Sequence, residues 1–273
     1  MDKKKQKKGK IVGIVCLVVC LLLGILLLIY GKRWNEQLKK LLGTSVEETV
    51  DSYIIYPEKK KKTDQENTYL KVEYINQKQQ GYPTGCESAC AVMALRYAGI
   101  ETDMKQFIKE YLKTAPVRWE EKKGKKEQRL VGPDPREAFA GDPSTEHGYG
   151  CELPVIYDGV SRLIKDRKKE VRAVDLSGQE LSSIVEKYID QKIPLLAWVT
   201  NRMEPVAEGT RWLIKEQHRE YVWKKGEHCI LILGYDKENY YYHDPVYGEY
   251  LSETREKLEN AYGYMGKQAM VIR

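Results

Sequence analysis

The residue with the clearest chemical signature is Cys86, which follows the sequence Pro-Thr-Gly and opens a stretch with helical spacing. A thiol in the first turn of a helix faces unpaired backbone N–H groups and the positive end of the helix dipole. Both stabilise a thiolate, which is the nucleophilic form of cysteine. The sequence therefore predicts Cys86 as a nucleophile for acyl transfer.

A base for this thiol is predicted at His228, the first residue of the apolar run 228–235. The end of a strand is a rigid place from which an imidazole can be aimed into a cleft. A polar turn follows the run, and the chain then returns toward Asp244. A hairpin would bring this carboxylate beside His228, where it can fix the imidazole tautomer. Side-chain alternation would point Cys229 and His243 the other way.

Two glutamines upstream of the cysteine can donate an amide hydrogen bond to an oxyanion that develops near Cys86. Gln77 ends a segment of strand-like composition, whereas Gln80 lies six residues before the cysteine. The spacing does not choose between them. Both glutamines stay open as oxyanion donors on this argument.

Helical segments are expected to support the nucleophile. The stretch 86–97 has helical spacing and ends before Gly99. Thr102 can cap a second helix, in which apolar residues recur at helical spacing: Met104, Phe107, Ile108, Tyr111 and Leu112. Further helices are predicted after Cys151 and from Ser177. They would bury Ile156, Val160, Leu163 and Ile164 in the first, and Leu181, Ile184, Val185, Tyr188 and Ile189 in the second.

Strand-like segments dominate the second half of the chain. The runs 193–200 and 228–235 are continuous and apolar, which is typical of buried strands, and 240–244 completes a hairpin. An earlier segment, 68–75, also has strand-like composition. Helices come first and an antiparallel sheet second, so the sequence predicts an α+β fold in which the cysteine helix packs on the sheet.

The N-terminal region predicts a membrane anchor. Residues 1–10 hold six lysines and one aspartate, and residues 11–30 follow without a charge. That length matches a helix crossing a hydrocarbon core of about 30 Å, and the lysines favour a cytoplasmic N-terminus with the C-terminal part outside the cell. A cleaved signal peptide and a lipoprotein attached through Cys20 are alternatives, but the small residues that their cleavage needs are missing.

The anchor defines the domain organisation. We expect a cytoplasmic basic tail 1–10, a transmembrane signal anchor 11–30, a polar juxtamembrane stalk 31–66 and one globular domain 67–273. The net charge is +6, of which the tail contributes +5, so the domain lacks the basic surface of a nucleic-acid-binding protein. We expect no nucleic-acid partner, and the oligomeric state stays open.

Several motifs in combination resemble a known family. They are Val72-Glu73-Tyr74-Ile75-Asn76-Gln77, Tyr82-Pro83-Thr84-Gly85-Cys86-Glu87-Ser88, Gly226-Glu227-His228-Cys229 and Asp244-Pro245. Together they resemble papain-like cysteine peptidase family thirty-nine, specifically stand-alone relatives of the double-glycine leader peptidases of bacteriocin exporters. The resemblance implies a papain-like fold without a metal or organic cofactor. It implies four site residues: Cys86 as nucleophile, His228 as general base, Asp244 as orienting acid and Gln77 as oxyanion donor.

The predicted activity is hydrolysis of a peptide or related amide bond outside the membrane. Exporter-associated members work in the cytoplasm beside a transporter and an ATPase that this sequence does not contain, so their peptide substrate is not implied here. A Cys-His-Asp set does not choose its acyl acceptor. A peptidoglycan amide hydrolase or acyltransferase is therefore an alternative, with a peptide or cell-wall substrate as partner. A third alternative is a tethered binding module without turnover.

Other cysteines and the tryptophans have competing interpretations. Cys90 with Cys86, His228 and Cys229 has the residue types of a zinc site, but the apolar helix around Cys90 favours a core position. Cys151 and Cys229 are candidates for a disulfide outside the cell. Three tryptophans could line a substrate groove or pack in a core: Trp119, Trp212 and Trp223.

Overall fold

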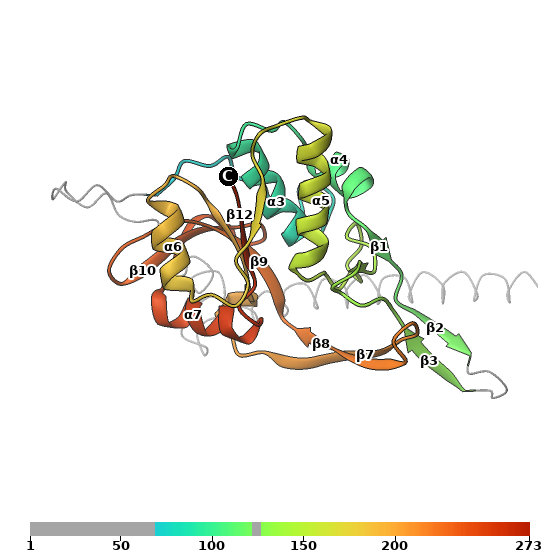
Figure 1. The fold of residues 1–273 in the computed structure, drawn as a ribbon. Helices are drawn as coiled ribbons and strands as arrows, with labels where there is room; N and C mark the ends of the chain where they lie inside the picture. The colour runs from blue at the N-terminus through green and yellow to red at the C-terminus, as the bar shows by residue number, and fades with distance from the viewer. Residues whose placement is uncertain (1–68, 122–126) are drawn as a thin grey trace, which may run out of the picture. The chain divides into compact units, whose positions relative to one another are not determined.

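A six-stranded antiparallel sheet forms the centre of the fold (Figure 1). The computed structural model describes residues 69–121 and 127–273. The strands follow the order β11-β10-β9-β6-β12-β5, and each neighbouring pair is antiparallel. Their bounds are β5 (Ala173–Asp175), β6 (Leu195–Thr200), β9 (Glu227–Tyr235), β10 (Asn239–Asp244), β11 (Gly248–Thr254) and β12 (Ala269–Ile272).

Helices cover both faces of this sheet. α3 packs on β9 and contacts α5, whereas α6 and α7 contact each other and pack on β9 and β6. Figure 1 shows these two pairs to the right and left of the sheet. The helices are α3 (Cys86–Tyr97), α4 (Met104–Gln106), the π-helix η1 (Phe107–Tyr111), α5 (Leu153–Asp166), α6 (Leu181–Ile189), the 3-10 helix η2 (Asn201–Met203) and α7 (Arg255–Tyr264).

The most apolar elements lie in the middle of this arrangement. Each residue of β6 is buried, and β9 is buried from His228 to Gly234. In α3 the residues from Cys86 to Leu95 are buried around the whole helix. Elements with neighbours on all sides have no solvent-facing stripe, so their sequences are continuous rather than alternating. The predicted cysteine therefore begins a helix that is held rigidly in the core.

A second sheet has four strands in the order β2-β3-β7-β8. Its strands are β2 (Arg118–Glu121), β3 (Gln128–Val131), β7 (Ala207–Ile214) and β8 (Arg219–Lys225), and a short parallel pair is formed by β1 (Thr114–Ala115) and β4 (Phe139–Ala140). Trp212 and Trp223 stack with ring centroids 6.0 Å apart and pack with Tyr149 and Tyr221. These two tryptophans form a small core, whereas Trp119 is 65% exposed.

Several elements have the predicted positions. The helix that begins at Cys86 has the expected bounds of 86–97. The hairpin of β9 and β10 forms with an antiparallel register that pairs Tyr240 with Tyr235. α5 and α6 bury the apolar residues expected of them. The α+β class, with the cysteine helix packed on an antiparallel sheet, is therefore confirmed.

Three local predictions are wrong. The segment 68–75 forms no strand in its described part: Tyr69 makes a single bridge to Gly234, and later N–H groups donate elsewhere, as Ile75 does to the sulfur of Met93. Asp103, rather than Thr102, caps the second helix through the N–H of Gln106. α6 begins four residues later than Ser177, whose N–H donates to the Asp175 side chain in a turn.

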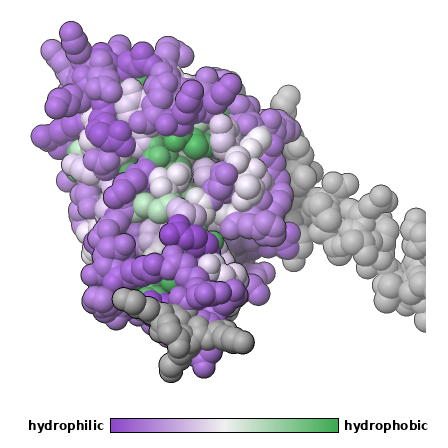
Figure 2. Space-filling view, turned by 90° about the vertical axis from the view of Figure 1, so that its right-hand side faces the viewer, coloured by the Kyte–Doolittle hydropathy of each residue, from purple (hydrophilic) through white to green (hydrophobic). Residues whose placement is uncertain are grey.

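The surface of the described residues is largely hydrophilic on the face that Figure 2 shows, with apolar residues gathered in a small central area. Within 69–121 and 127–273, no helix has the length and apolar composition that crossing a membrane requires. The predicted tail 1–10, anchor 11–30 and stalk 31–66, with the first two residues of the predicted domain, lie outside the described residues.

Candidate active site

Cys86 begins α3 in a tightly packed first turn. A Cβ on Gly85, the residue before it, would lie 3.1 Å from Cβ of Tyr82 and 3.2 Å from Cε of Met104. The Cys86 side chain is buried, and its Sγ donates a hydrogen bond of 3.3 Å to Oε2 of Glu87. The predicted nucleophile is therefore fixed in position by glycine-dependent packing and is held by a carboxylate.

A cavity of about 150 Å³ lies beside this thiol. Three of the predicted site residues line it: Cys86 from α3, His228 from β9 and Gln77 from the segment before α3. The rest of the lining comes from Pro83, Thr84, Tyr149, Asn201, Glu227, Val246 and Tyr247. Residues that are far apart in the sequence thus share one small space that can receive part of a substrate.

Asp244, the fourth predicted residue, lies directly behind His228. Nε2 of His228 is 2.9 Å from Oδ2 of Asp244, and both side chains are buried. The ring N–H is not well aligned with that oxygen, so the contact is an ion pair more than a directed hydrogen bond. The other carboxylate oxygen accepts the backbone N–H groups of Val246 and Tyr247. The hairpin predicted from the sequence brings these two residues together.

The two partners of this pair favour their charged forms. Burial acts to lower the pKa of His228, but the nearby Asp244 carboxylate outweighs it, and the pKa is raised above its ordinary value. Burial acts to raise the pKa of Asp244, but the charge of His228 and the backbone donors outweigh it, and the pKa is lowered. An imidazolium facing a carboxylate is the arrangement that produces such opposite shifts.

Of the two candidate glutamines, only Gln77 reaches the cavity. Its side chain is 2% exposed, and its Nε2 donates a hydrogen bond of 2.6 Å to the carbonyl of Pro83. Its backbone N–H donates to the carbonyl of Pro245, next to Asp244, which ties the segment to the hairpin. Gln80 is exposed and does not line the cavity. The geometry therefore favours Gln77 as the amide nearest to the thiol.

The remaining described histidines lie away from this site. His243 is fully buried, with Nε2 at 3.0 Å from the carbonyl of Val72 and Nδ1 accepting the N–H of Tyr250. Both ring nitrogens are thus occupied by the backbone, as expected for a residue that points away from the cavity. His147 and His218 are exposed.

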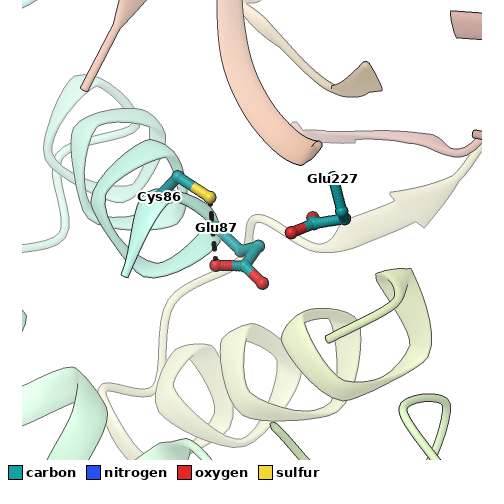
Figure 3. Close-up of side chains that lie close together, drawn as sticks. All are labelled: Cys86, Glu87 and Glu227. Carbon is teal, nitrogen blue, oxygen red and sulfur yellow. Dashed lines mark hydrogen bonds between the residues drawn. The ribbon is translucent and has the colours of Figure 1, made fainter. Parts of the chain in front are cut away.

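Two glutamates that the sequence analysis did not single out meet at the thiol (Figure 3). Glu87 is fully buried, and its Oε1 accepts the backbone N–H of Cys151 at 2.7 Å. Glu227 begins β9, and its Oε1 is buried without a hydrogen-bond partner. Both flank predicted site residues in the sequence, and Glu87 is a charged residue within an otherwise uncharged buried helical stretch. A charged residue inside a buried apolar helix is unusual, and this was the signal in the sequence that could have identified a functional position.

These carboxylates reverse one expectation. The helix start was expected to stabilise the thiolate of Cys86, but its pKa is raised well above the ordinary value. Burial is the largest cause, followed by the negative charges of Glu87 and Glu227. Burial likewise raises the pKa of Glu87, and burial together with Glu87 raises that of Glu227 far above the ordinary carboxyl value. Burial, together with the neighbouring carboxylates, therefore outweighs the stabilisation expected from the helix start at this cysteine.

Cys86, Glu87 and Glu227 also have side chains of the kinds that bind metal ions, and they lie close together in the described part of the chain. Sγ of Cys86 and carboxylate oxygens of Glu87 and Glu227 all lie within 4.8 Å of one another. The oxygens of Glu87 already accept the thiol and the backbone N–H of Cys151. The zinc set considered from the sequence, which needs Cys90 and Cys229, does not form such a group among the described residues.

The described cysteines are free thiols: Cys86, Cys90, Cys151 and Cys229. A disulfide between Cys151 and Cys229 is therefore not formed. Sγ of Cys90 donates to the carbonyl of Cys229 at 3.4 Å, which agrees with its expected place in the core. The thiols of Cys90, Cys151 and Cys229 are fully buried and do not line the cavity.

Comparisons with known proteins find similarity to C39-like peptidases. The model of the Peptidase_C39 like family matches residues 69–270. The uncharacterized protein YvpB of Bacillus subtilis (strain 168) is 27% identical over 188 residues, which are 69% of this chain and 68% of that protein. A crystal structure of a candidate C39-like peptidase from Bacillus anthracis is 25% identical, with a TM-score of 0.60 over 75% of this chain and 96% of that chain.

Proposed function

Because the chain belongs to the peptidase C39-like family, we propose that it is a cysteine peptidase that hydrolyses a peptide or related amide bond. Four side chains carry the proposed reaction: Cys86, His228, Asp244 and Gln77. The observation that supports it most is the shared cavity, which three of these residues line while Asp244 contacts His228 from behind. This is the arrangement of nucleophile, base and orienting acid that acyl transfer requires.

In the proposed reaction the Cys86 thiol gives its proton to His228, and the thiolate sulfur attacks the substrate carbonyl carbon. The carbonyl oxygen becomes an oxyanion, which the amide N–H of Gln77 stabilises. His228 then gives the proton to the leaving amine as its C–N bond breaks, and an acyl-enzyme thioester remains. A water molecule that loses its proton to His228 attacks the thioester, and hydrolysis releases the acid and the Cys86 thiol.

Asp244 prepares His228 for both proton transfers. Its carboxylate faces Nε2, so Nδ1 is the ring nitrogen that is free to exchange a proton with the thiol and the substrate. The raised pKa of His228 means that the imidazolium formed in the first step is stabilised. The role proposed for Asp244 is therefore to hold the imidazole and to stabilise its charge, not to take up the proton itself.

We place the reaction outside the cell, with the chain anchored in the membrane. Residues 11–30 are uncharged and long enough to cross a bilayer, and the six lysines before them favour a cytoplasmic N-terminus. This location makes extracellular peptides and the peptide stems of the cell wall the accessible substrates. Protease added to cells without a wall is expected to degrade the C-terminal domain, and deletion of 11–30 is expected to release the protein from the membrane fraction. If the domain is protected in these wall-less cells while their membrane is intact, the proposed orientation is wrong.

The activity is tested with the full-length chain and a peptide library, with cleavage products identified by mass spectrometry. We expect Cys86→Ala to abolish cleavage and Cys151→Ala, which removes another buried thiol outside the cavity, to retain it. Peptidoglycan fragments and amine acceptors form separate arms, which distinguish a cell-wall amidase or acyltransferase. Products that form at the same rate with Cys86→Ala would contradict a cysteine mechanism, and a lack of products in every arm would favour a binding module.

A further inference from the structure

Two carboxylates face the thiol of Cys86 in the core. Glu87 accepts its hydrogen bond at 3.3 Å, and Figure 3 shows the Glu227 carboxylate next to that of Glu87. Both glutamates converge on Gly150, where a Cβ would lie 2.7 Å from Oε2 of Glu227 and 2.9 Å from Oε1 of Glu87. Two carboxylates so close together in a buried place cannot both ionise without a large cost, so they share a proton.

The hydrogen bonds decide where the negative charge of this pair resides. Glu87 accepts donors at both oxygens, from the thiol of Cys86 and from the N–H of Cys151. Glu227 has no donor at its buried Oε1. Donors stabilise a carboxylate, and burial without them favours the neutral acid. Glu87 is therefore the anion and Glu227 the acid at neutral pH, in agreement with the larger upward pKa shift of Glu227.

No cation among 69–121 and 127–273 offsets this charge, since neither glutamate forms an ion pair with a lysine or arginine there. The charged and titratable groups that face the pair come from four places: Cys86 and Cys90 on α3, Cys151 and Glu152 after Gly150, His228 and Cys229 on β9, and Tyr221 on β8. Only His228 among them can be positive, and its charge is matched by Asp244.

We propose that Glu87 is a positioning residue that restrains the nucleophile: its carboxylate holds the Cys86 proton and opposes a thiolate at neutral pH, and this restraint is released in mild acid, when the Glu87–Glu227 pair takes up a second proton. The proposal rests on the proposed role of Cys86 as nucleophile. When the second proton binds, Glu87 becomes a neutral acid that can donate to the sulfur. His228 has a raised pKa and is already an imidazolium in mild acid, so the thiol proton leaves to solvent water and the thiolate faces this imidazolium without Glu87 as a neighbouring anion.

The test measures the reactivity of Cys86 without a peptide substrate. The full-length chain is alkylated with iodoacetamide from pH 4.5 to 9, where the sulfur forms a C–S bond and iodide leaves, and mass spectrometry quantifies each cysteine. For Glu87→Gln, which mimics a permanently protonated Glu87, we expect Cys86 to be alkylated at least about tenfold faster than wild type at pH 8, with the ratio falling toward one at pH 5. A structural defect would change the rate at every pH instead.

Glu73→Gln is the matched control, since Glu73 is an exposed carboxylate that pairs with Arg96 near the other end of α3 and does not line the cavity. Its alkylation profile is expected to follow wild type. Glu227→Gln provides a second test if Glu87→Gln does not fold. The new amide is neutral, as the protonated Glu227 is, so Cys86 should be alkylated at about the wild-type rate from pH 4.5 to pH 8.

The outcomes separate this inference from the proposed function. A ratio of Glu87→Gln to wild type that stays near one at pH 8, or that does not change with pH, would overturn the restraint by Glu87. Alkylation of Cys86 in Glu227→Gln that is several-fold faster than wild type at pH 8 would overturn the assignment of Glu87 as the anion. If Cys86 is no more reactive than Cys90 or Cys151 at any pH, in wild type and in both variants, the nucleophile itself is wrong and the proposed function fails with it.

Discussion

Two buried groups of titratable side chains meet around the cavity and respond to burial in opposite ways. At the hairpin of β9 and β10, His228 and Asp244 lie 2.9 Å apart, and the pKa of the histidine is raised while that of the aspartate is lowered. At the start of α3, Cys86 lies beside Glu87 and Glu227, and all three pKa values are raised. The hairpin therefore favours the charged forms of His228 and Asp244, whereas the helix start disfavours the negatively charged forms of its three side chains.

Burial is similar in the two places, so it does not explain the difference. Removal from water disfavours ionisation of every group, and the partner then decides the outcome. At the hairpin the partner has the opposite charge and two backbone N–H groups support it. At the helix the partners have the same charge as the thiolate. The proposed base is therefore stabilised in its charged form, whereas the thiolate of the proposed nucleophile is disfavoured.

The largest effect is expected from removing the complementary pair. Asp244→Ala leaves His228 buried without its partner, so we expect a loss of about 3–5 kcal/mol of stability and of at least about 100-fold in kcat/KM. Asp244→Asn keeps an acceptor oxygen for Nε2 and should restore part of the activity. Denaturant unfolding and peptide cleavage measure the two effects. A fully active Asp244→Ala protein would remove the hairpin pair from the mechanism.

The pair also makes stability depend on pH with a defined sign. The raised pKa of His228 gives stability that is complete below the ordinary imidazole pKa of about 6.5 and is lost as pH rises through the folded value. The lowered pKa of Asp244 gives stability that is complete above about pH 4 and is lost in stronger acid. The stability difference between wild type and Asp244→Asn should therefore be greatest between about pH 4 and pH 6.5.

Gln77 lines the cavity beside Cys86, and its neutral amide is the proposed oxyanion donor. Gln77→Ala should lower kcat by about 100-fold, because it removes the amide proposed to stabilise the oxyanion, while KM changes little. Gln80→Ala is the matched control, since Gln80 is exposed and outside the cavity. Steady-state kinetics on one peptide decide the assignment. An inactive Gln80→Ala with a normal Gln77→Ala would transfer the role to Gln80.

Gly150 tests how closely the like-charged carboxylates are packed. Its φ is +140°, and a Cβ there would press on Glu227 and Glu87. We expect Gly150→Ala to cost about 2 kcal/mol of stability from strain and displaced carboxylates. Gly178→Ala separates the two causes, because Gly178 has φ +80° and no atom within 4 Å of the added Cβ. If Gly150→Ala and Gly178→Ala lose the same stability in thermal unfolding, displacing the two carboxylates costs no stability.

The smallest effect is expected from relieving the like charges. A carboxyl group whose folded pKa is raised costs stability as pH rises from its unfolded pKa of about 4.3 toward the folded value. Glu227→Gln removes that cost, so its stability relative to wild type should increase by about 1 kcal/mol between pH 4 and pH 8. Denaturation at the two pH values measures this change. A relative stability that decreases with pH would mean that Glu227 is stabilised as an anion.

The elements that follow from local patterns are those that the sequence predicted well. α3 has the predicted bounds because its continuous apolar stretch ends just before Gly99, which has φ +75°. The segment 68–75 was misjudged because strand-like composition does not guarantee a partner strand: Tyr69 and Leu70 meet the end of β9, but the N–H of Ile75 donates to the sulfur of Met93. Local composition gives a segment a preference for helix or strand, but whether the segment forms a strand depends on a partner strand that the fold must supply.

The sequence by itself determined the nucleophile's helix, the hairpin and the closeness of His228 to Asp244, because a helical repeat and a turn act over a few residues. Only the tertiary structure decided that Gln77 rather than Gln80 reaches the cavity, and that Glu227 and Glu87 meet at Cys86. The physical reason is that pKa values in a core depend on charges a few ångströms away in space. Here those charges come from residues more than a hundred positions apart in the chain, and no local pattern encodes them.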